Sequence, residues 1–228
     1  MKNQDRRSQT AATAAVVTQT LEARCDEQKV SSMYEHSIPV IPSESRSILD
    51  VGCGDGESLR DAHFPAGSLS VGVDINLRSL KECRRKLPSS HFVLVSGEQL
   101  GFCNESFDAY ISRVSWPYTH IPPTAKEAYR VLKPGGYLWV KLHPFGFVLS
   151  HCLASARSLN FKDAAFRAYV ILNGVAFHCT GKNYRFPLNR KRCESFQTVR
   201  SIRRALIQAG FRDVQITQGA SFLATARK

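Results

Sequence analysis

Short apolar segments alternate with amphipathic segments through the middle of the chain. Five apolar segments are rich in Val, Ile and Tyr, as buried strands are, and they cover 47–52, 70–74, 92–95, 107–113 and 137–142. Three segments between them have the apolar spacing of helices, at 57–62, 77–86 and 123–132. Strands separated by helices predict a parallel sheet with right-handed crossovers and with helices on both faces.

The end of the chain adds three elements to this pattern. Residues 198–209 have apolar positions at the spacing of a buried helix face, and Gly210 is placed to end that helix. Segments 211–216 and 220–226 predict two further strands. The pattern as a whole therefore predicts one α/β domain with seven strands.

The first predicted strand leads into a run of glycines. Gly52, Gly54 and Gly56 alternate with other residues directly before the predicted helix at 57–62. Glycine at such a turn permits unusual backbone dihedrals and lets a ligand approach the backbone closely. The second strand ends at Asp74, 22 positions after Gly52, which is close to the roughly 20 residues at which a nucleotide-binding βαβ unit places its ribose-binding acid. The spacing therefore predicts a nucleotide-type site.

Residues at the ends of several strands point to the same place. Ligands of open α/β sheets bind at the carboxyl ends of the strands, where the strand order reverses. Five residues fall at predicted strand ends and are expected to line one crevice there: Asp50, Gly52, Asp74, Ser96 and Arg113.

The glycine spacing separates two kinds of nucleotide site. A dinucleotide site has the pattern G-x-G-x-x-G, and the chain has Glu57 where its third glycine belongs, which argues against an NAD-dependent oxidoreductase. The segment 49–56 instead resembles the first motif of class I S-adenosylmethionine-dependent methyltransferases. Four later segments resemble that family in the same order: 71–76, 96–100, 105–111 and 130–138.

The resemblance implies a fold and a division of the chain. The implied fold is Rossmann-like: a doubly wound, mostly parallel seven-stranded sheet whose last two strands form an antiparallel hairpin. Residues 1–30 are expected to form a tail and a short helix around Thr18 to Lys29, and 31–143 the cofactor-binding core. Residues 144–195 would form a helical cap inserted over the active site, and 196–228 the closing helix and hairpin.

The resemblance also implies S-adenosyl-L-methionine as the cofactor and assigns residues to it. Asp50 would lie near its amino group, Asp74 would accept hydrogen bonds from its ribose hydroxyls, and Ile75 would pack on its adenine. The family commonly has Asp at the position of Ser96, whose hydroxyl, or else Glu98, would then serve the adenine amino group. The complete predicted cofactor site is Asp50, Gly52, Cys53, Gly54, Asp74, Ile75, Ser96, Gly97, Glu98 and Arg113.

The acceptor side has weaker signals. Tyr118 and His120 lie where acceptors enter in the family, and His143 ends the fifth strand, so each is a candidate general base or a packing residue. The segment 115–118 is only partly similar to the motif of amino-group methyltransferases, because it lacks that motif's first proline. The His and Cys residues have no finger-like spacing, so no metal site is expected.

The net charge and the cysteines indicate which partners and which compartment suit the chain. The chain has 228 residues and a net charge of +12, of which residues 182–228 contribute +9. Such a basic region suits RNA phosphates, anionic lipid headgroups or an acidic substrate, and a solvated basic surface is the plainer interpretation. The seven cysteines are scattered without C-x-x-C spacing, which favours free thiols in a reducing, cytoplasmic setting.

The sequence therefore predicts an S-adenosylmethionine-dependent methyltransferase. The inserted segment 144–195 is rich in apolar residues, which favours a small apolar or aromatic acceptor, or peripheral contact with a lipid surface. A satellite core at the edge of the sheet would explain the same composition. The alternatives are an RNA methyltransferase that uses the basic C-terminal region and a non-catalytic cofactor-binding module.

Overall fold

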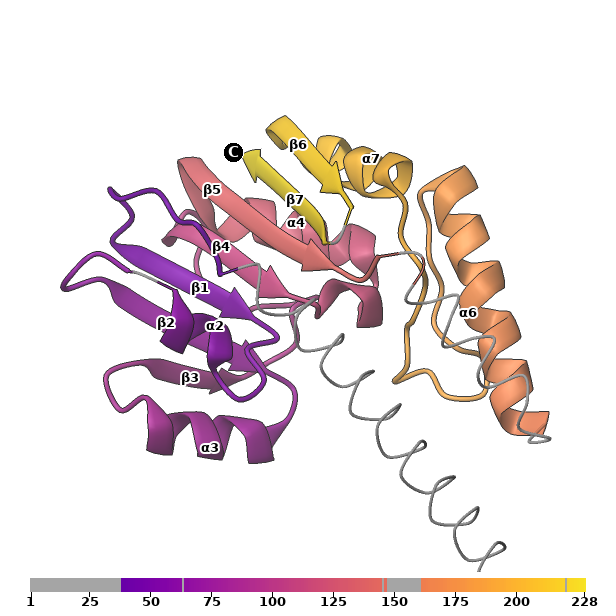
Figure 1. Ribbon diagram of the computed structural model, residues 1–228, viewed down its shortest axis with the longest axis horizontal. Helices are drawn as coiled ribbons and strands as arrows, with labels where there is room; N and C mark the ends of the chain where they lie inside the picture. Colours follow the sequence, from indigo (N-terminus) through magenta and orange to yellow (C-terminus); the bar gives the residue numbers. More distant parts are fainter. Residues whose placement is uncertain (1–37, 63, 145, 147–160, 220) are drawn as a thin grey trace, which may run out of the picture. The chain divides into compact units, whose positions relative to one another are not determined.

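The computed structural model describes residues 38–228, except residues 63, 145, 147–160 and 220. Within this part the chain forms one compact unit built on a seven-stranded sheet of order β3-β2-β1-β4-β5-β7-β6 (Figure 1). The short helix expected at Thr18 to Lys29 and the first part of the cap lie outside the described residues.

The sheet is mixed, with five parallel strands and a closing antiparallel pair. β1 pairs in parallel with β2 and β4, and the parallel pairing continues to β3 on one side and β5 on the other. β7 is antiparallel to both β5 and β6. The strands are β1 (Ser47–Val51), β2 (Leu69–Asp74), β3 (His91–Leu94), β4 (Phe107–Arg113), β5 (Leu132–Leu142), β6 (Arg212–Gln218) and β7 (Phe222–Arg227).

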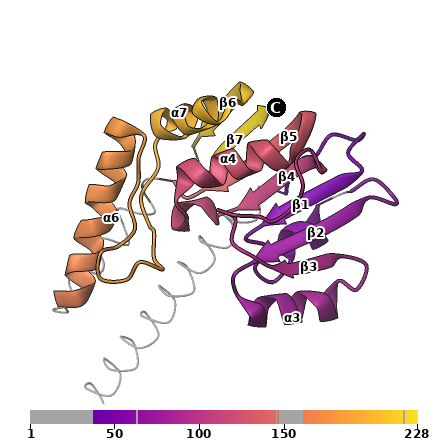
Figure 2. The same cartoon turned by 180° about the vertical axis from the view of Figure 1, so that it is seen from behind.

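Helices cover both faces of this sheet. α4 and α7 lie on one face (Figure 2), where Ile121, Ala128 and Leu206 join one core cluster. Leu59 of α2 and Leu80 of α3 join the core cluster on the other face. Full burial of each such Leu or Ile side chain contributes roughly 1.5–3 kcal/mol to folding. The described helices are α2 (Glu57–Asp61), α3 (Leu77–Lys86), the 3₁₀ helix η1 (Trp116–Tyr118), α4 (Ile121–Val131), α6 (Phe161–Thr180) and α7 (Val199–Ala209). The predicted doubly wound, mostly parallel fold is confirmed.

The starts of α4 and β5 differ from the prediction for local reasons. α4 begins at Ile121 rather than at Pro123, because prolines are tolerated in the first turn, where the N–H groups have no helical partner. β5 begins at Leu132 rather than at 137, since Leu132 pairs with Phe107 before the register shifts at the glycine pair. The pattern also missed η1, which three residues are too few to signal.

The described part of the cap consists mainly of α6 and the segment that returns from it. Phe177 of α6 joins the main core cluster. The side chain of Asn173 holds the returning segment, since it accepts a hydrogen bond from the N–H of Tyr184 and donates one to the Tyr184 carbonyl (2.6 and 2.9 Å). In the described part of the chain, no helix is long and apolar enough to cross a membrane.

Candidate functional site

The glycine turn after β1 has the backbone geometry that its sequence predicts. Gly52, Gly54 and Gly56 have φ angles of +73°, +53° and +86°, in the left-handed region that side chains disfavour. The N–H groups of Gly52 and Cys53 both donate to the Val73 carbonyl, at 2.8 and 3.0 Å. A Cβ built on Gly54 would meet nothing within 4 Å, so the turn has open space on that side for a ligand.

A strained corner after β4 explains why Gly52 has no side chain. Val114 has a φ of +62°, which is costly for a β-branched residue and turns the chain sharply. The turn brings Ser115 against the glycine run, where a Cβ on Gly52 would lie 2.2 Å from the Ser115 Cβ. The Ser115 hydroxyl donates to the Val51 carbonyl at 2.9 Å. Sequence reasoning missed this contact, because the two segments are 63 positions apart.

Asp74 lies beside the glycine turn, as the spacing predicts. The Gly54 N–H donates to Asp74 Oδ2 (2.9 Å) and the Asn76 N–H donates to Oδ1 (2.8 Å). A carboxylate has about four acceptor sites, so both oxygens can still accept hydrogen bonds from hydroxyl groups. The adjoining Ile75 exposes 75% of its surface, which leaves an apolar side chain available for an aromatic ligand.

Asp50 is the most unusual residue of the site. Its side chain is fully buried, and neither carboxylate oxygen has a hydrogen-bond partner among the described residues. Burial raises the pKa of Asp50 to about 7, and nearby Asp74 adds to the rise while Arg113 opposes it. An unpaired buried carboxylate is costly, and a cationic ligand group would relieve that cost.

Arg113, the last residue of β4, is largely buried and forms an ion pair with Glu57. Glu57, which replaces the third glycine of a dinucleotide site, therefore has a role of its own: its carboxylate neutralises the Arg113 guanidinium next to Asp50. The spacing of the sequence gave no signal for this pair, because Glu57 begins α2 and Arg113 ends β4.

The predicted adenine loop is held by its own side chains. The Glu98 N–H donates to the Ser96 hydroxyl (3.2 Å), so that this hydroxyl stabilises the local turn. A Cβ on Gly97 would lie 2.7 Å from Val51, which leaves no room for a side chain. The Glu98 carboxylate accepts a hydrogen bond from the His120 N–H (3.0 Å) and pairs with Arg185. Glu98 thus joins the cofactor side of the site to the cap.

Cys53 has the role of a small buried side chain. It is 6% exposed and belongs to the core cluster under α2 and α3. Burial, with Asp50 as the next cause, raises the pKa of its thiol well above the ordinary range. A thiol that stays protonated is a poor nucleophile, which agrees with a packing role.

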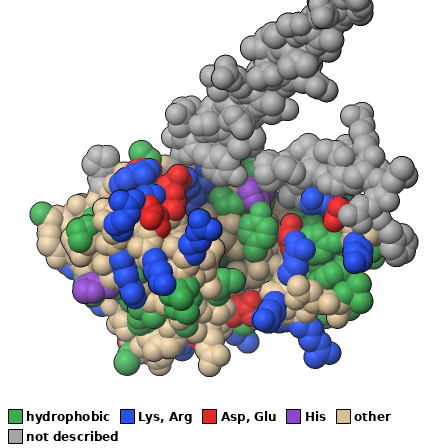
Figure 3. Space-filling view, turned by 90° about the horizontal axis from the view of Figure 1, so that it is seen from below, with side chains coloured by type: hydrophobic (Ala, Val, Ile, Leu, Met, Phe, Trp, Pro, Cys, Tyr) green, Lys and Arg blue, Asp and Glu red, His purple; other side chains and the backbone are tan. Residues whose placement is uncertain are grey.

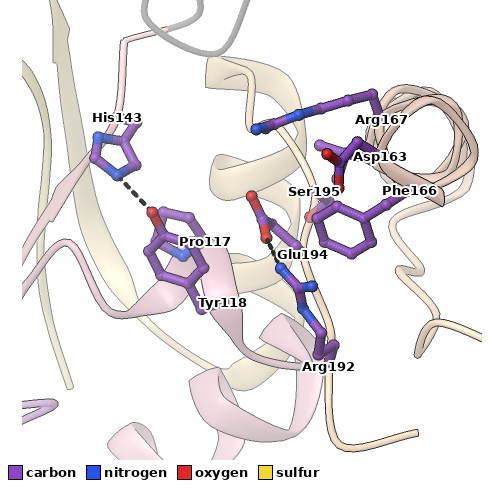
Figure 4. Close-up of a pocket in the computed structure, with 10 residues that line it drawn as sticks. Pro117, Tyr118, His143, Asp163, Phe166, Arg167, Arg192, Glu194 and Ser195 are labelled. Carbon is purple, nitrogen blue, oxygen red and sulfur yellow. Dashed lines mark hydrogen bonds and ion pairs between the residues drawn. The ribbon is translucent and has the colours of Figure 1, made fainter. Parts of the chain in front are cut away.

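Two of the three candidate bases lie together. The Tyr118 hydroxyl and His143 Nε2 are 3.1 Å apart, with their rings edge to face at 6.0 Å (Figure 4). His120 is not among the residues that line this cavity; it is the N-cap residue of α4, and its N–H donates to Glu98. Burial lowers the pKa of His120, and Arg185 adds to the lowering while Glu98 opposes it.

Tyr118 and His143 line a cavity of about 370 Å³ between the sheet and the cap. Arg167 points into this cavity from α6, and Arg192 lies over the ring of Phe166 at 3.7 Å (Figure 4). Arg192 also pairs with Glu194 at 3.7 Å. The sequence could not identify these residues, because α6 and its return have no spacing that marks a site. The lining is Pro117, Tyr118, His143, Asp163, Phe166, Arg167, Val170, Arg192, Glu194 and Ser195.

The residues around the glycine turn fit S-adenosylmethionine. The unpaired carboxylate of Asp50 suits an ammonium group, the open side of Gly54 gives room, and Asp74 and exposed Ile75 suit a ribose and an adenine. In the described part of the chain, no group of three or more His, Cys, Asp or Glu side chains gathers that could hold a metal ion.

Comparison with known proteins leads to the same family. A family model described as a methyltransferase domain matches residues 49–140. The chain is 37% identical over 113 residues to the phthiotriol/phenolphthiotriol dimycocerosates methyltransferase of Mycobacterium leprae, in a match that covers 47% of this chain and 41% of that protein. It is 28% identical over 191 residues to the ubiquinone/menaquinone biosynthesis C-methyltransferase of Rickettsia felis, covering 76% of this chain and 71% of that one. The chain thus spans less than half of the length of the first of these relatives.

A solved structure shares the fold. An S-adenosylmethionine-dependent methyltransferase of Thermotoga maritima, described as a possible histamine N-methyltransferase, superposes with a TM-score of 0.55 at 18% identity. The superposition covers 88% of this chain and 87% of that one. Residues 49–140 thus match a methyltransferase domain, and the sheet topology and the glycine turn are those that this resemblance implies.

Proposed function

We propose that this protein transfers a methyl group from S-adenosylmethionine to a hydroxyl group of a small, apolar or aromatic acceptor held in the cavity beneath α6. The observation that carries the proposal is the Tyr118–His143 hydrogen bond inside that cavity. Tyr118 follows β4 and His143 follows β5, so both lie at the sheet edge that carries the glycine turn. Two relatives support a small apolar or aromatic acceptor, one named for phthiotriol and phenolphthiotriol dimycocerosates and the other, a C-methyltransferase, for ubiquinone and menaquinone biosynthesis. The choice of a hydroxyl group rests on the Tyr118–His143 pair.

The cofactor would be held by residues with complementary chemistry. Asp50 would take the ammonium group, Asp74 the ribose hydroxyls and Ile75 one face of the adenine, while the backbone at Gly52 and Gly54 would line the methionine part. Bound there, S-adenosylmethionine supplies a methyl group activated by the sulfonium. The protein's task is to hold donor and acceptor in line and to manage one proton.

Tyr118 and His143 would provide the path for that proton. When neutral His143 Nε2 accepts the hydrogen bond, the Tyr118 oxygen can accept the proton of the acceptor hydroxyl, while its own proton passes to Nε2. The acceptor oxygen would then be the nucleophile for the methyl group that bound S-adenosylmethionine would supply, with the thioether as leaving group. Arg167 adds positive charge in the cavity, which favours the deprotonated acceptor oxygen.

The cavity and the basic residues favour a small acceptor over RNA. Phe166, Val170 and Pro117 give the cavity an apolar wall. Several cations of the C-terminal region have intramolecular partners, which makes them less available to RNA phosphates. Arg203, Arg204 and Arg227 donate to backbone carbonyls, and Lys228 pairs with Glu105.

Cofactor binding is tested by calorimetric titration with S-adenosylmethionine and with S-adenosylhomocysteine. Asp74→Ala should weaken binding about 10- to 100-fold, because hydrogen bonds to a charged group contribute about 1.5–3 kcal/mol. Asp74→Asn, which keeps an acceptor for the Gly54 N–H, should show a smaller loss. Glu82→Ala, which removes an exposed carboxylate on α3, is the matched control and should bind normally. Absence of heat with the wild-type protein would contradict the whole proposal.

Transfer is tested with a labelled methyl donor and a panel of phenols, quinols, long-chain alcohols and RNA. We expect label on a hydroxyl-bearing apolar compound. Tyr118→Phe and His143→Gln should each lower kcat about 100-fold and leave cofactor affinity unchanged. Label on RNA that falls steeply with salt would support the RNA alternative instead. Cofactor binding without transfer to any acceptor would support a non-catalytic module.

A further inference from the structure

α6 has two apolar faces, and the structure buries only one of them. Phe166, Val170 and Phe177 pack inward, each less than 10% exposed. The opposite face repeats at helical spacing and lies in solvent: Ala164, Ala168, Ile171, Leu172, Val175 and Cys179. Ile171, Leu172 and Val175 are 42%, 68% and 47% exposed, and no Lys, Arg, Asp or Glu occurs between Arg167 and Lys182. We call these six residues the outer face of α6.

An exposed apolar tip is anchored next to this helix. The Asn189 N–H donates to the Phe186 carbonyl (3.1 Å), which closes a tight turn with Leu188 at its tip. Leu188 is 83% exposed, the largest exposed fraction among the described large hydrophobic residues. The Phe186 ring packs on Phe166 and Tyr169 of α6, with centroids 5.2 and 4.8 Å away. The tip is therefore fixed to the helix and does not hang free.

Basic side chains accompany both features. Arg190 and Lys191 follow Leu188 after one intervening residue, Asn189; Lys182 lies just past the end of α6, and all three cations are exposed. Among the described residues, the ion pairs of this segment engage Arg185 and Arg192 but none of these three cations. Seen from below, hydrophobic side chains with Lys and Arg around them gather on the part of the surface near α6 (Figure 3).

The combination identifies the partner by its chemistry. Exposed apolar side chains beside cations without an ion pair match the layered chemistry of an anionic membrane, whose acyl boundary accepts Leu and Val while its headgroups accept Lys and Arg. Two carboxylates near α6, those of Asp163 and Glu194, line the cavity and not the outer face of α6. Since no described helix can cross a membrane, the contact would be peripheral.

We propose that the outer face of α6 and the Leu188 tip dock this protein on an anionic lipid surface. Leu172, Val175 and Leu188 enter the interfacial layer, and Lys182, Arg190 and Lys191 contact the headgroups. α6 lines the cavity with its other face, through Phe166 and Val170. If the acceptor is as proposed above, docking places the cavity beside the phase in which an apolar acceptor concentrates.

The test is flotation of the full-length protein with vesicles of phosphatidylcholine alone or of phosphatidylcholine and phosphatidylglycerol at 3:1. We expect the protein to float with the anionic vesicles and to be released by salt. The double variant Leu172→Ser/Leu188→Ser and the double variant Arg190→Glu/Lys191→Glu should each lower the bound fraction at least about fivefold. Ile207→Ser replaces a residue of α7 that is 57% exposed; it is the matched control and should float like the wild type.

Calorimetry with S-adenosylmethionine separates this proposal from the function of the site. Both double variants should bind the cofactor as the wild type does, which also shows that they are folded. Docking is overturned if the wild type stays out of the floating fraction with both vesicles, or if the apolar double variant floats as well as the wild type. A concentration-dependent dimer that Leu172→Ser abolishes, without vesicle binding, would assign this face to a second copy of the chain instead.

Discussion

At the scale of single residues, Asp50 shows how the proposed cofactor site would cost stability. Its carboxylate is buried at the end of β1 without a hydrogen-bond partner among the described residues, a situation that proteins avoid unless a ligand completes it. The nearest opposing charge is Arg113, and Glu57 already neutralises that cation. Asp50 thus remains poised for a positive group that comes from outside the chain.

We expect Asp50→Asn to stabilise the ligand-free protein and to weaken cofactor binding. The pKa of Asp50 is about 7 in the folded state and 3.8 without the fold, so the folded state holds the proton more tightly. The carboxylate therefore lowers stability progressively between about pH 4 and pH 7, and the loss stays constant above that, at about 4 kcal/mol at most. Urea unfolding at pH 4 and pH 8 measures this loss of stability. The free energy of unfolding of the variant should exceed that of the wild type at pH 8 and equal it at pH 4. A variant less stable than the wild type at pH 8 would show that Asp50 has a partner.

At the scale of elements, the carboxylate of Asp108 raises the stability of the fold, whereas that of Asp50 lowers it. Asp108 Oδ2 accepts hydrogen bonds from the Arg46 and Ser47 N–H groups and from the Ser47 hydroxyl, and Oδ1 accepts one from Lys133, at 2.7–2.9 Å. These contacts tie the start of β1 to β4 and to the first residues of β5. Although partial burial alone would raise it, the hydrogen bonds from Lys133 and Ser47 lower the pKa of Asp108 to about 2.

We expect Asp108→Asn to destabilise the protein at neutral pH by about 1–2 kcal/mol, after allowance for the partial exposure of this side chain. Because the folded pKa is depressed, the contribution of Asp108 is present above about pH 4 and is lost as the pH falls through about 2. The two proteins should therefore approach each other in urea unfolding at pH 2.5, while a difference that persists there would assign the loss to packing. Cofactor affinity should not change, since Asp108 lies at the other end of β4 from Arg113.

At the scale of the whole molecule, cofactor binding and folding are linked. The site joins β1, β2 and β4 to the loop after β3, so an occupied site stabilises the sheet as a unit. A ligand that binds only the folded state at 100 times its Kd adds about 2.7 kcal/mol. For a domain of this size, this corresponds to a rise of about 5–10 °C in Tm.

Thermal unfolding with S-adenosylhomocysteine measures this linkage. The wild type should show the full shift, and Asp50→Asn should show a much smaller one despite its higher starting Tm at pH 8. The Leu172→Ser/Leu188→Ser variant should shift like the wild type, because its changes lie on the outer face of α6 and on the tip. Equal shifts in Asp50→Asn and the wild type would remove Asp50 from the cofactor site.

The sequence by itself determined the sheet and the meeting of the glycine turn with Asp74, where we propose that the cofactor binds. Gly52, Gly54 and Asp74 belong to one βαβ unit, in which short connections force the turn and the next strand end to meet. Local spacing is therefore enough to predict that they converge. The same holds for the doubly wound topology, because each strand and helix carries its own periodicity.

Only the tertiary structure decided the acceptor side and the surface of α6. Tyr118, His143 and Arg167 come from η1, the end of β5 and the cap, and no local pattern relates such distant segments. α6 is apolar on both faces, so its sequence lacks the one-sided periodicity that reveals which face turns inward. Asp50 and Glu57 are plain to see in the sequence, but the burial of Asp50 and the ion pair of Glu57 with Arg113 exist only in the folded chain.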